Sequence, residues 1–515
     1  ADLNTIDTNS DNNVVATAAT TLTGTAAAIK TAIEAGTIDT ATNVAVSVNS
    51  GTASVSQLAD IDNATTGIIT ATATEGDMAT LASLTNDNSN NAITVTVTDA
   101  SVAAGALNTL DGKTSANVTA TAVTAITGTA AAIATALSAT TIDHAAATIT
   151  ATVDAGSVAA ADLNTIDTNS DNNVVATAAT TLTGTAAAIK TAIEAGTIDT
   201  ATNVAVSVNS GTVTVAQLKA INAATTGAIV LSDTSGALSA SASDLVSALA
   251  GTVTDYTGNV TVTNSVNISQ LKAINDAVSG TITLDDTSGA LYGTASDLFD
   301  ALTGITNYSG VIVITDEPTV TQLKTINDAA SSSITLNDTN GALSGTASDL
   351  VDAFAGTVTE HEGSVTVTDA ATIAQLTTID AATTGTMIYT SMTDSASNLA
   401  GNVGSYVSGS VNITVTGATV SAADLNTIDG LTGGTVTATA ATAITGTAAA
   451  IATALSATTI DHAAATITAT VDAGSVAAAD LNTIDTNSDN NVVATAVTAI
   501  TGTAAAIATA LSATT

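Results

Sequence analysis

The feature that most constrains this chain is a short motif, Leu-x-x-Ile or Leu-x-x-Leu, that returns along the whole sequence. A clear version is the segment from Ala161 to Asp167, Ala-Asp-Leu-Asn-Thr-Ile-Asp. A nearly constant period over an entire chain indicates a repeat protein. The Leu of the motif stands at positions 3, 58, 107, 163, 218, 271, 323, 376, 425 and 481.

A second motif divides each repeat into two parts. In the segment Thr-Ala-Ala-Ala-Ile-Ala-Thr-Ala-Leu that ends at Leu137, Ile133 follows Leu107 by 26 residues, and Ile189 follows Leu163 by the same distance. In the more divergent repeats this offset is 27 residues, and in two of them it is 23. The elementary unit is therefore a coil of about 26 residues, and two alternating versions make a repeat of about 53.

Each coil predicts one strand followed by one short helix. Residues 148–153 alternate Thr with Ile, Ala or Val, as a half-buried strand does. Residues 215–221 place apolar side chains at i, i+3 and i+6, which predicts one or two helical turns, 3₁₀ in part. The segment Thr294-Ala-Ser-Asp297 has the spacing of a helix N-cap, and Gly304 follows where that helix should end.

The predicted fold is a repeat solenoid, α/β or β-rich, with a parallel strand ladder and about 19 coils. At roughly 4.8 Å per coil, the array would form a rod on the order of 90 Å long. We expect Val153, Leu163, Ile166 and Ile189 to be buried, and Thr150 to be exposed.

The domain organisation predicted is one continuous array over residues 1–515. Residues 1–52 are identical to 161–212, and residues 124–178 are identical to 442–496. The blocks 1–212 and 401–515 are thus near-identical duplications, whereas 213–400 holds diverged repeats. Because both ends copy interior sequence and neither resembles a polar capping repeat, we expect a fragment of a longer chain, or molecules that stack end to end.

Composition narrows the classes of partner. The chain carries 45 acidic residues against 6 basic ones, a formal charge of −39, and no cysteine. This charge argues against nucleic acid, which requires basic patches. Polar residues interrupt every long apolar stretch, so we expect no membrane span. Metal cations and further copies of the chain are the partners that this composition favours.

Three phrases suggest a family. Residues 182–189 (Leu-Thr-Gly-Thr-Ala-Ala-Ala-Ile), 163–167 (Leu-Asn-Thr-Ile-Asp) and 259–263 (Asn-Val-Thr-Val-Thr) recur in variants over essentially the whole chain. They resemble the Thr/Ala-rich repeats of giant secreted bacterial surface proteins, described as β-strand-repeat proteins and found in cyanobacteria among others. The resemblance implies a structural or adhesive role at the cell surface or outside the cell, and it brings no catalytic residues with it.

The strongest candidate for a metal site is the pattern Asp-x-Asn-x-Asp, whose alternating oxygen ligands resemble the start of a calcium-binding loop. The glycine at the sixth position and the glutamate at the twelfth are missing. The alternative is that these Asp and Asn residues end a helix in an Asx turn. The candidate calcium ligands are Asp7, Asn9, Asp11, Asp167, Asn169, Asp171, Asp485, Asn487 and Asp489.

Other candidate chemistry is weaker. Outward rows of Thr are compatible with ice binding, but Thr is also an ordinary exposed strand residue. His144, His361 and His462 have no cysteine to complete a metal cluster. No Ser or Asp is accompanied by the base and orienting group that catalysis needs, so we expect a protein without enzymatic activity and without a required cofactor.

Two functional hypotheses follow. The first is a non-enzymatic structural protein, a segment of a secreted filament, sheath or surface layer. The alternative is the repetitive stalk of a large adhesin, stabilised by calcium, with ice binding as a more remote variant.

Overall fold

The computed structural model describes residues 1–49, 51–85 and 90–514. Over these residues the fold is an α/β architecture in which short parallel strands alternate with helices, and no ladder of strands closes into a barrel. The chain divides into two compact units. Unit 1 comprises Ala1–Val260 with Ala277–Gly280, and unit 2 comprises Thr261–Asp276 with the residues from Thr281 onward.

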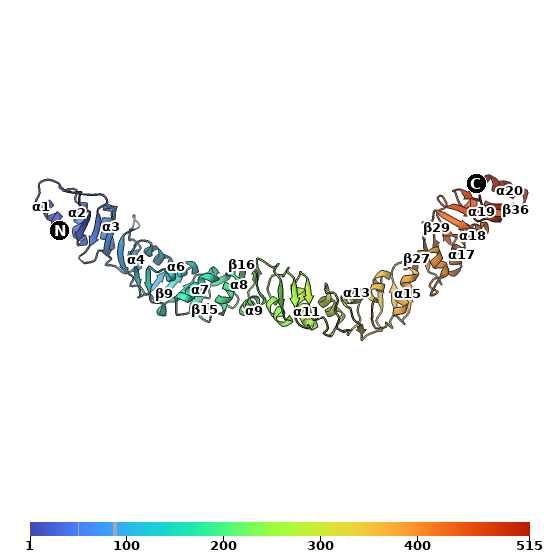
Figure 1. Ribbon diagram of the computed structural model, residues 1–515, viewed down its shortest axis with the longest axis horizontal. Coiled ribbons are helices and arrows are strands. Elements are labelled where there is room, and N and C mark those ends of the chain that lie inside the picture. The colour runs from blue at the N-terminus through green and yellow to red at the C-terminus, as the bar shows by residue number, and fades with distance from the viewer. Residues whose placement is uncertain (50, 86–89, 515) are drawn as a thin grey trace. The chain divides into compact units, whose positions relative to one another are not determined.

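Unit 1 carries the first half of the repeats, and its successive helices, such as α7, α8 and α9, pack side by side in chain order (Figure 1). Its helices are α1 (Asp2–Thr8), α2 (Ala26–Glu34), α3 (Val55–Ala64), α4 (Met78–Leu81), α5 (Ala104–Asp111), α6 (Ala130–Ser138), the 3₁₀ helix η1 (Ala146–Thr148), α7 (Ala160–Asn169), α8 (Ala186–Glu194), α9 (Val215–Ala224) and α10 (Ala242–Leu249). Its strands are β1 (Val14–Ala16), β2 (Thr21–Gly24), β3 (Ile38–Thr40), β4 (Ala45–Val48), β5 (Ile69–Thr72), β6 (Ala92–Thr96), β7 (Ser101–Ala103), β8 (Val118–Ala120), β9 (Ala125–Gly128), β10 (Ile142–His144), β11 (Thr150–Val153), β12 (Gly156–Ala159), β13 (Val174–Ala176), β14 (Ala179–Thr185), β15 (Ile198–Thr200), β16 (Ala205–Ser210), β17 (Ile229–Leu231) and β18 (Leu238–Ala240).

Strand β19 (Val260–Val262) and helix α11 (Ile268–Ala277) lie at the sequence boundary between the units. The other helices of unit 2 are α12 (Ala295–Leu302), α13 (Val320–Ala329), α14 (Ala347–Ala353), α15 (Ile373–Ala382), α16 (Ala396–Gly401), α17 (Ala422–Leu431), α18 (Ala448–Ser456), α19 (Ala478–Asn487) and α20 (Ala504–Ala513). Its strands are β20 (Ile282–Leu284), β21 (Leu291–Gly293), β22 (Ile312–Ile314), β23 (Ile334–Leu336), β24 (Leu343–Gly345), β25 (Val365–Val367), β26 (Met387–Ile388), β27 (Ser391–Ser395), β28 (Asn412–Thr416), β29 (Thr419–Ser421), β30 (Val436–Thr437), β31 (Ala443–Gly446), β32 (Ile460–Asp461), β33 (Thr468–Val471), β34 (Gly474–Ala477), β35 (Val492–Val493) and β36 (Val497–Thr501).

Small aliphatic side chains stack in register to make the core. In unit 1, Leu182 of β14 pairs with Val206 of β16, which pairs with Ile229 of β17, and each is at most 1% exposed. In unit 2, Ile312 of β22 lies between its two strand partners in the same way. Neighbouring parallel strands lie only about 4.8 Å apart, so side chains of this size fill the layer without aromatic bulk.

The helices begin at the predicted caps. The Thr294 hydroxyl accepts the N–H of Asp297 at the start of α12, as the Thr-Ala-Ser-Asp pattern predicts. Gly304 follows with φ of +79°, a left-handed conformation that glycine adopts without strain. Full capping boxes form where glutamine stands three residues after the cap, as with Thr214 and Gln217 of α9, which sequence analysis did not single out.

Burial confirms most of the predicted core. Leu163, Ile166 and Ile189 are fully buried and Val153 is 1% exposed. The prediction of an exposed Thr150 was wrong, because this residue is half-buried, whereas its neighbour Thr152 is exposed.

The strand count and the helix length also differ from expectation. Two strands separate many neighbouring helices, for example β13 and β14 between α7 and α8, where one strand per helix was expected. The Thr-Gly turns inside these segments split what looks like one alternating run into two strands. Helix α9 is a ten-residue α-helix, longer than the predicted one or two turns, because its capping box and buried apolar stripe stabilise it.

Candidate functional site

The contact between one helix and the next is where polar side chains of this chain are organised, and α9 with α10 is the clearest case. Leu218 and Ile221 of α9 and Leu245 and Ala248 of α10 are fully buried. This apolar seam brings the helices together, and it leaves polar side chains at its rim to bond across the contact.

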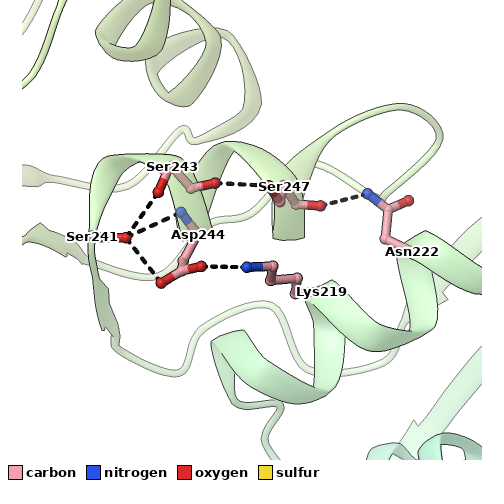
Figure 2. A network of polar contacts seen from close by, with 6 residues as sticks. All are labelled: Lys219, Asn222, Ser241, Ser243, Asp244 and Ser247. Atoms are coloured by element: carbon pink, nitrogen blue, oxygen red, sulfur yellow. Dashed lines mark hydrogen bonds and ion pairs between the residues drawn. The ribbon is translucent and has the colours of Figure 1, made fainter. Parts of the chain in front are cut away.

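Lys219 and Asp244 form an ion pair across the rim, drawn in Figure 2. The Ser241 hydroxyl donates to the other oxygen of the same carboxylate at 2.9 Å, while Ser241 also caps α10. The hydrogen bonds from Lys219 and then from Ser241 lower the pKa of Asp244 below its ordinary value. The carboxylate therefore stays ionised and holds the first turn of α10 to α9.

Asn222 lies one turn further along α9 and holds the other end of α10. Its amide Nδ2 donates to the carbonyls of Ser247 at 2.9 Å and Ala250 at 3.0 Å (Figure 2). These carbonyls belong to the end of the helix, where acceptors lack a partner in the next turn. We call this pair, Lys219 with Asn222, the Lys–Asn clasp.

The Lys–Asn clasp recurs in unit 2. The ion pairs there are Lys272 with Asp300 and Lys324 with Asp352. The amide bonds are Asn275 to the carbonyls of Asp300 at 2.6 Å and Thr303 at 3.1 Å, and Asn327 to the carbonyl of Asp352 at 2.8 Å.

The duplicated repeats use a different pair of side chains at the same two positions. On α7, Asn164 replaces the lysine and donates to the carbonyl of Ala188, in the first turn of α8, at 3.0 Å. Asp167 replaces the second Asn and accepts the hydroxyl of Thr197, just beyond the end of α8. We call this pair, Asn164 with Asp167, the Asn–Asp clasp. The Asn bond of this clasp recurs from Asn4 to Ala28, Asn108 to Ala132, Asn426 to Ala450 and Asn482 to Ala506.

A buried hydroxyl follows many of these helices and bonds backward along the chain. Thr225, 7% exposed, donates to the carbonyl of Val204 at 2.5 Å and accepts the N–H of Gly227 at 2.9 Å. Ser170, 4% exposed, donates to the carbonyl of Ile149 at 2.9 Å. The equivalent bonds are Thr65 to Val44, Thr383 to His361, Thr432 to Val411 and Ser488 to Ile467.

Several carboxylates cap helices from a distance. Asp316 accepts the N–H of Ala295, at the start of α12, at 2.6 Å, although it follows that helix in the sequence. Negative charge at a helix N-terminus is favourable because the first N–H groups have no partner in the helix. Part of the acidic excess therefore has a structural use. The same contact links Val55 with Glu75, Met78 with Asp99, Ala347 with Asp369 and Ile373 with Asp394.

A hollow of about 620 Å³ opens beside the Lys–Asn clasp of α9. Val215, Ala216 and Ala220 form its apolar wall, and Lys219 and Asp244 lie at its polar edge. Because these two charged groups neutralise one another, neither is free to act as a base or nucleophile. The hollow supports no reaction mechanism.

The candidate calcium residues lie where helices end. Asp167 and Asn169 belong to the last turns of α7, and the Asn169 amide donates to the carbonyl of Thr165 at 2.8 Å. Asp171 is exposed and its N–H bonds the carbonyl of Ala146 at 3.2 Å. Calcium at this pattern remains a prediction. In the other two copies, Asn9 and Asn487 also bond back into their helices, and Asp11 and Asp489 are exposed, while Asp7 and Asp485 lie on helices α1 and α19.

The three histidines differ in their surroundings. His144 and His462, in duplicated segments, are half-buried and bond the carbonyls of Leu137 and Leu455 through Nε2. His361 is 2% exposed. Outside residues 50, 86–89 and 515, no three His, Asp or Glu side chains gather as a metal would require.

Sequence analysis missed both clasps and the buried hydroxyls. The signal for the hydroxyl was present, since Thr or Ser stands four residues after the Ile of the motif in several repeats, as Thr225 does after Ile221. The clasps gave no local signal, because each bond reaches a helix about 25 residues further along the chain.

Comparison with known proteins does not identify the chain. No protein-family model matches the sequence, and no characterised protein does either. Within the ranges that the structure describes, no helix is both long and apolar enough to cross a membrane.

Proposed function

We propose that this chain is a non-enzymatic structural protein, a segment of a secreted filament, sheath or surface layer, wound as one continuous solenoid over residues 1–515. The observation that carries the proposal is the pairing of each helix with the next one along the chain through the clasps and the buried hydroxyls. Such contacts couple neighbours only, so repeats can be added or lost without disturbing a distant site.

The duplicated blocks support the same proposal. Residues 124–178 and 442–496 are identical and keep their buried side chains in both positions, for example Leu163 and Leu481. A chain that contains exact copies of a multi-repeat block has changed its length by duplication. Length is a property that a filament or layer can vary freely, whereas an enzyme cannot.

Electron microscopy of the native material tests this proposal. A structural role predicts regular fibres or a lattice, and antibodies against the unique segment 213–260 should label them along their length. Dispersed compact particles, with no label on any fibre or layer, would reject it.

The alternative is the stalk of a large adhesin, which the same repeats would serve equally well by holding a distant binding tip away from the cell. The sequence of the full gene separates the two, because a stalk requires a non-repetitive, aromatic-rich domain at one end. A role outside the cell or at its surface belongs to both versions of the proposal.

Self-association and calcium are further parts of the proposal. Each ladder of parallel strands has open edges, where another chain can add, and a net charge of −39 opposes that contact unless salt or divalent cations screen it. Light scattering with calcium and with a chelator should then show larger particles with calcium. A monomer at high concentration in both conditions would reject self-association.

A further inference from the structure

His361 occupies a position that tyrosine fills in two related repeats. The Tyr256 hydroxyl donates to the carbonyl of Gly236 at 2.7 Å, and the Tyr308 hydroxyl donates to that of Gly289 at 2.8 Å. The backbone of each tyrosine forms a parallel bridge to the next coil, and His361 forms the same bridge to Thr383. The three aromatic side chains therefore hold equivalent places.

The imidazole lacks the contact that the tyrosines make. His361 is 2% exposed, and neither ring nitrogen has a hydrogen-bond partner among the described residues. Its ring lies against the ring of Phe354, with centroids 6.0 Å apart. A buried neutral imidazole in such a place is tolerated, but a buried imidazolium would carry an unpaired charge.

The backbone of His361 is also central to the contact between coils. Its N–H donates to the carbonyl of Ala382 at 3.1 Å. Its carbonyl accepts the Thr383 hydroxyl and the Thr384 N–H, both at 2.8 Å. Any movement that brings the ring to water breaks these bonds.

The charged groups around the ring act in the opposite direction to its burial. Burial lowers the pKa of His361, whereas the carbonyl of Gly341 and the carboxylates of Glu317 and Asp338 raise it, and burial is the larger effect. The flanking Glu360 and Glu362 are exposed. Since the pKa in the folded repeat is below the value near 6.5 of an open one, stability is complete above about pH 6.5 and falls as the pH decreases from there.

We propose that the repeat around His361 is a proton-sensitive weak point of the chain, where protonation of the buried ring opens the contact between residues 354–363 and 380–384. The tyrosine repeats lack this response, because their hydroxyls stay protonated and bonded at mildly acidic pH. Burial, for example, raises the pKa of Tyr308 to about 12.

Hydrogen exchange of the full chain at pH 7.5 and pH 5.0 tests the proposal, with rates corrected for the intrinsic effect of pH. Peptides within 354–366 should lose protection at pH 5.0, by up to about tenfold for each pH unit below 6.5 until the His361 pKa is reached. The matched peptides within 302–314, around Tyr308, should keep theirs. Equal behaviour of the two segments would overturn the proposal.

Two variants sharpen the test. His361→Tyr should abolish the acid response of segment 354–366, and His144→Gln should leave it intact. If His361→Tyr does not fold, nuclear magnetic resonance titration of labelled histidines in the wild-type chain decides, with His144→Gln and His462→Gln assigning the signals. A His361 signal that titrates with the ordinary pKa near 6.5 would contradict the proposal.

Discussion

The diverged repeats at α9, α11 and α13 and the duplicated repeats on either side of them join successive helices by different side chains at the same two positions. Directly after the motif Leu, the diverged repeats place Lys219 and the duplicated ones Asn164; three residues later they place Asn222 and Asp167. In both α9 and α7, the first position holds the first turn of the next helix, and the second holds its end.

This difference teaches that the helix spacing is set by the apolar seam and not by the clasp. Leu163 and Leu218 are both fully buried, although their neighbouring clasps differ in charge and in hydrogen-bond direction. The clasp must satisfy whichever backbone or side-chain group lies opposite it. Exchanging the side chains between the two kinds of repeat should therefore have unequal consequences.

The largest effect expected comes from Asn222→Asp. The new carboxylate would face the carbonyls of Ser247 and Ala250, acceptor against acceptor, where an amide now donates. We expect residues 242–250 to lose about 1–3 kcal/mol of opening free energy, measured by hydrogen exchange.

The reverse exchange, Asp111→Asn, is the matched control. Asp111 accepts the hydroxyl of Thr141 at 2.7 Å, and the oxygen of an amide can accept the same bond. The change should cost less than about 0.5 kcal/mol in the unique segment 101–123. A cost as large as that of Asn222→Asp would show that the two clasps do not differ as described.

The second prediction concerns a contact that both kinds of repeat share. Thr225→Val removes the donor to Val204 and the acceptor for Gly227, which should cost about 1–3 kcal/mol because both groups are buried. Thr225→Ser keeps the hydroxyl, as Ser170 has it naturally, and should cost much less. Denaturant-dependent hydrogen exchange of segment 225–231 measures both, and equal losses would place the effect in packing instead.

A smaller effect is expected for the ion pair of the Lys–Asn clasp. Lys219→Met keeps the aliphatic stem but removes the charge, and both partners are more than 40% exposed, so the expected loss is at most about 1 kcal/mol. It should shrink further in 1 M salt, which screens exposed charges. Exchange of segment 242–250 at low and high salt checks this, and a loss that is independent of salt would refute an electrostatic origin.

The smallest effect is the pH dependence of the same pair. The pKa of Asp244 is below its ordinary value of 3.8, first because of Lys219. The contribution of the pair is therefore present above about pH 4 and is lost as the pH falls through the lowered pKa. A double-mutant cycle of Lys219→Met with Asp244→Asn should show coupling at pH 6 that declines by pH 3. Coupling that is constant over this range would contradict the assignment.

Local patterns in the sequence predicted what depends on local physics. The Thr294 cap, the positive φ of Gly304 and the burial of Leu163 and Ile166 follow from spacing and side-chain type within one coil. The α/β class with parallel strands followed in the same way.

Contacts between coils could not be predicted from such patterns. The partner of Asn222 depends on how far α10 lies along the next coil, which changes where Thr-Gly turns divide a strand in two. The half-burial of Thr150 has the same origin, since alternation gives the face of a residue and not what covers that face. The role of Asp316 as a cap for α12 required its distance from Ala295, 21 residues earlier in the chain.

The central claim is that each repeat is stabilised by its immediate neighbours, and the hydrogen-exchange profile of Asn222→Asp over the whole chain tests it most directly. The account predicts lost protection in unique peptides between residues 213 and 260, and unchanged protection in those between 364 and 436. Loss of protection in both segments to the same extent would show that the chain unfolds as one cooperative body, and would contradict the account.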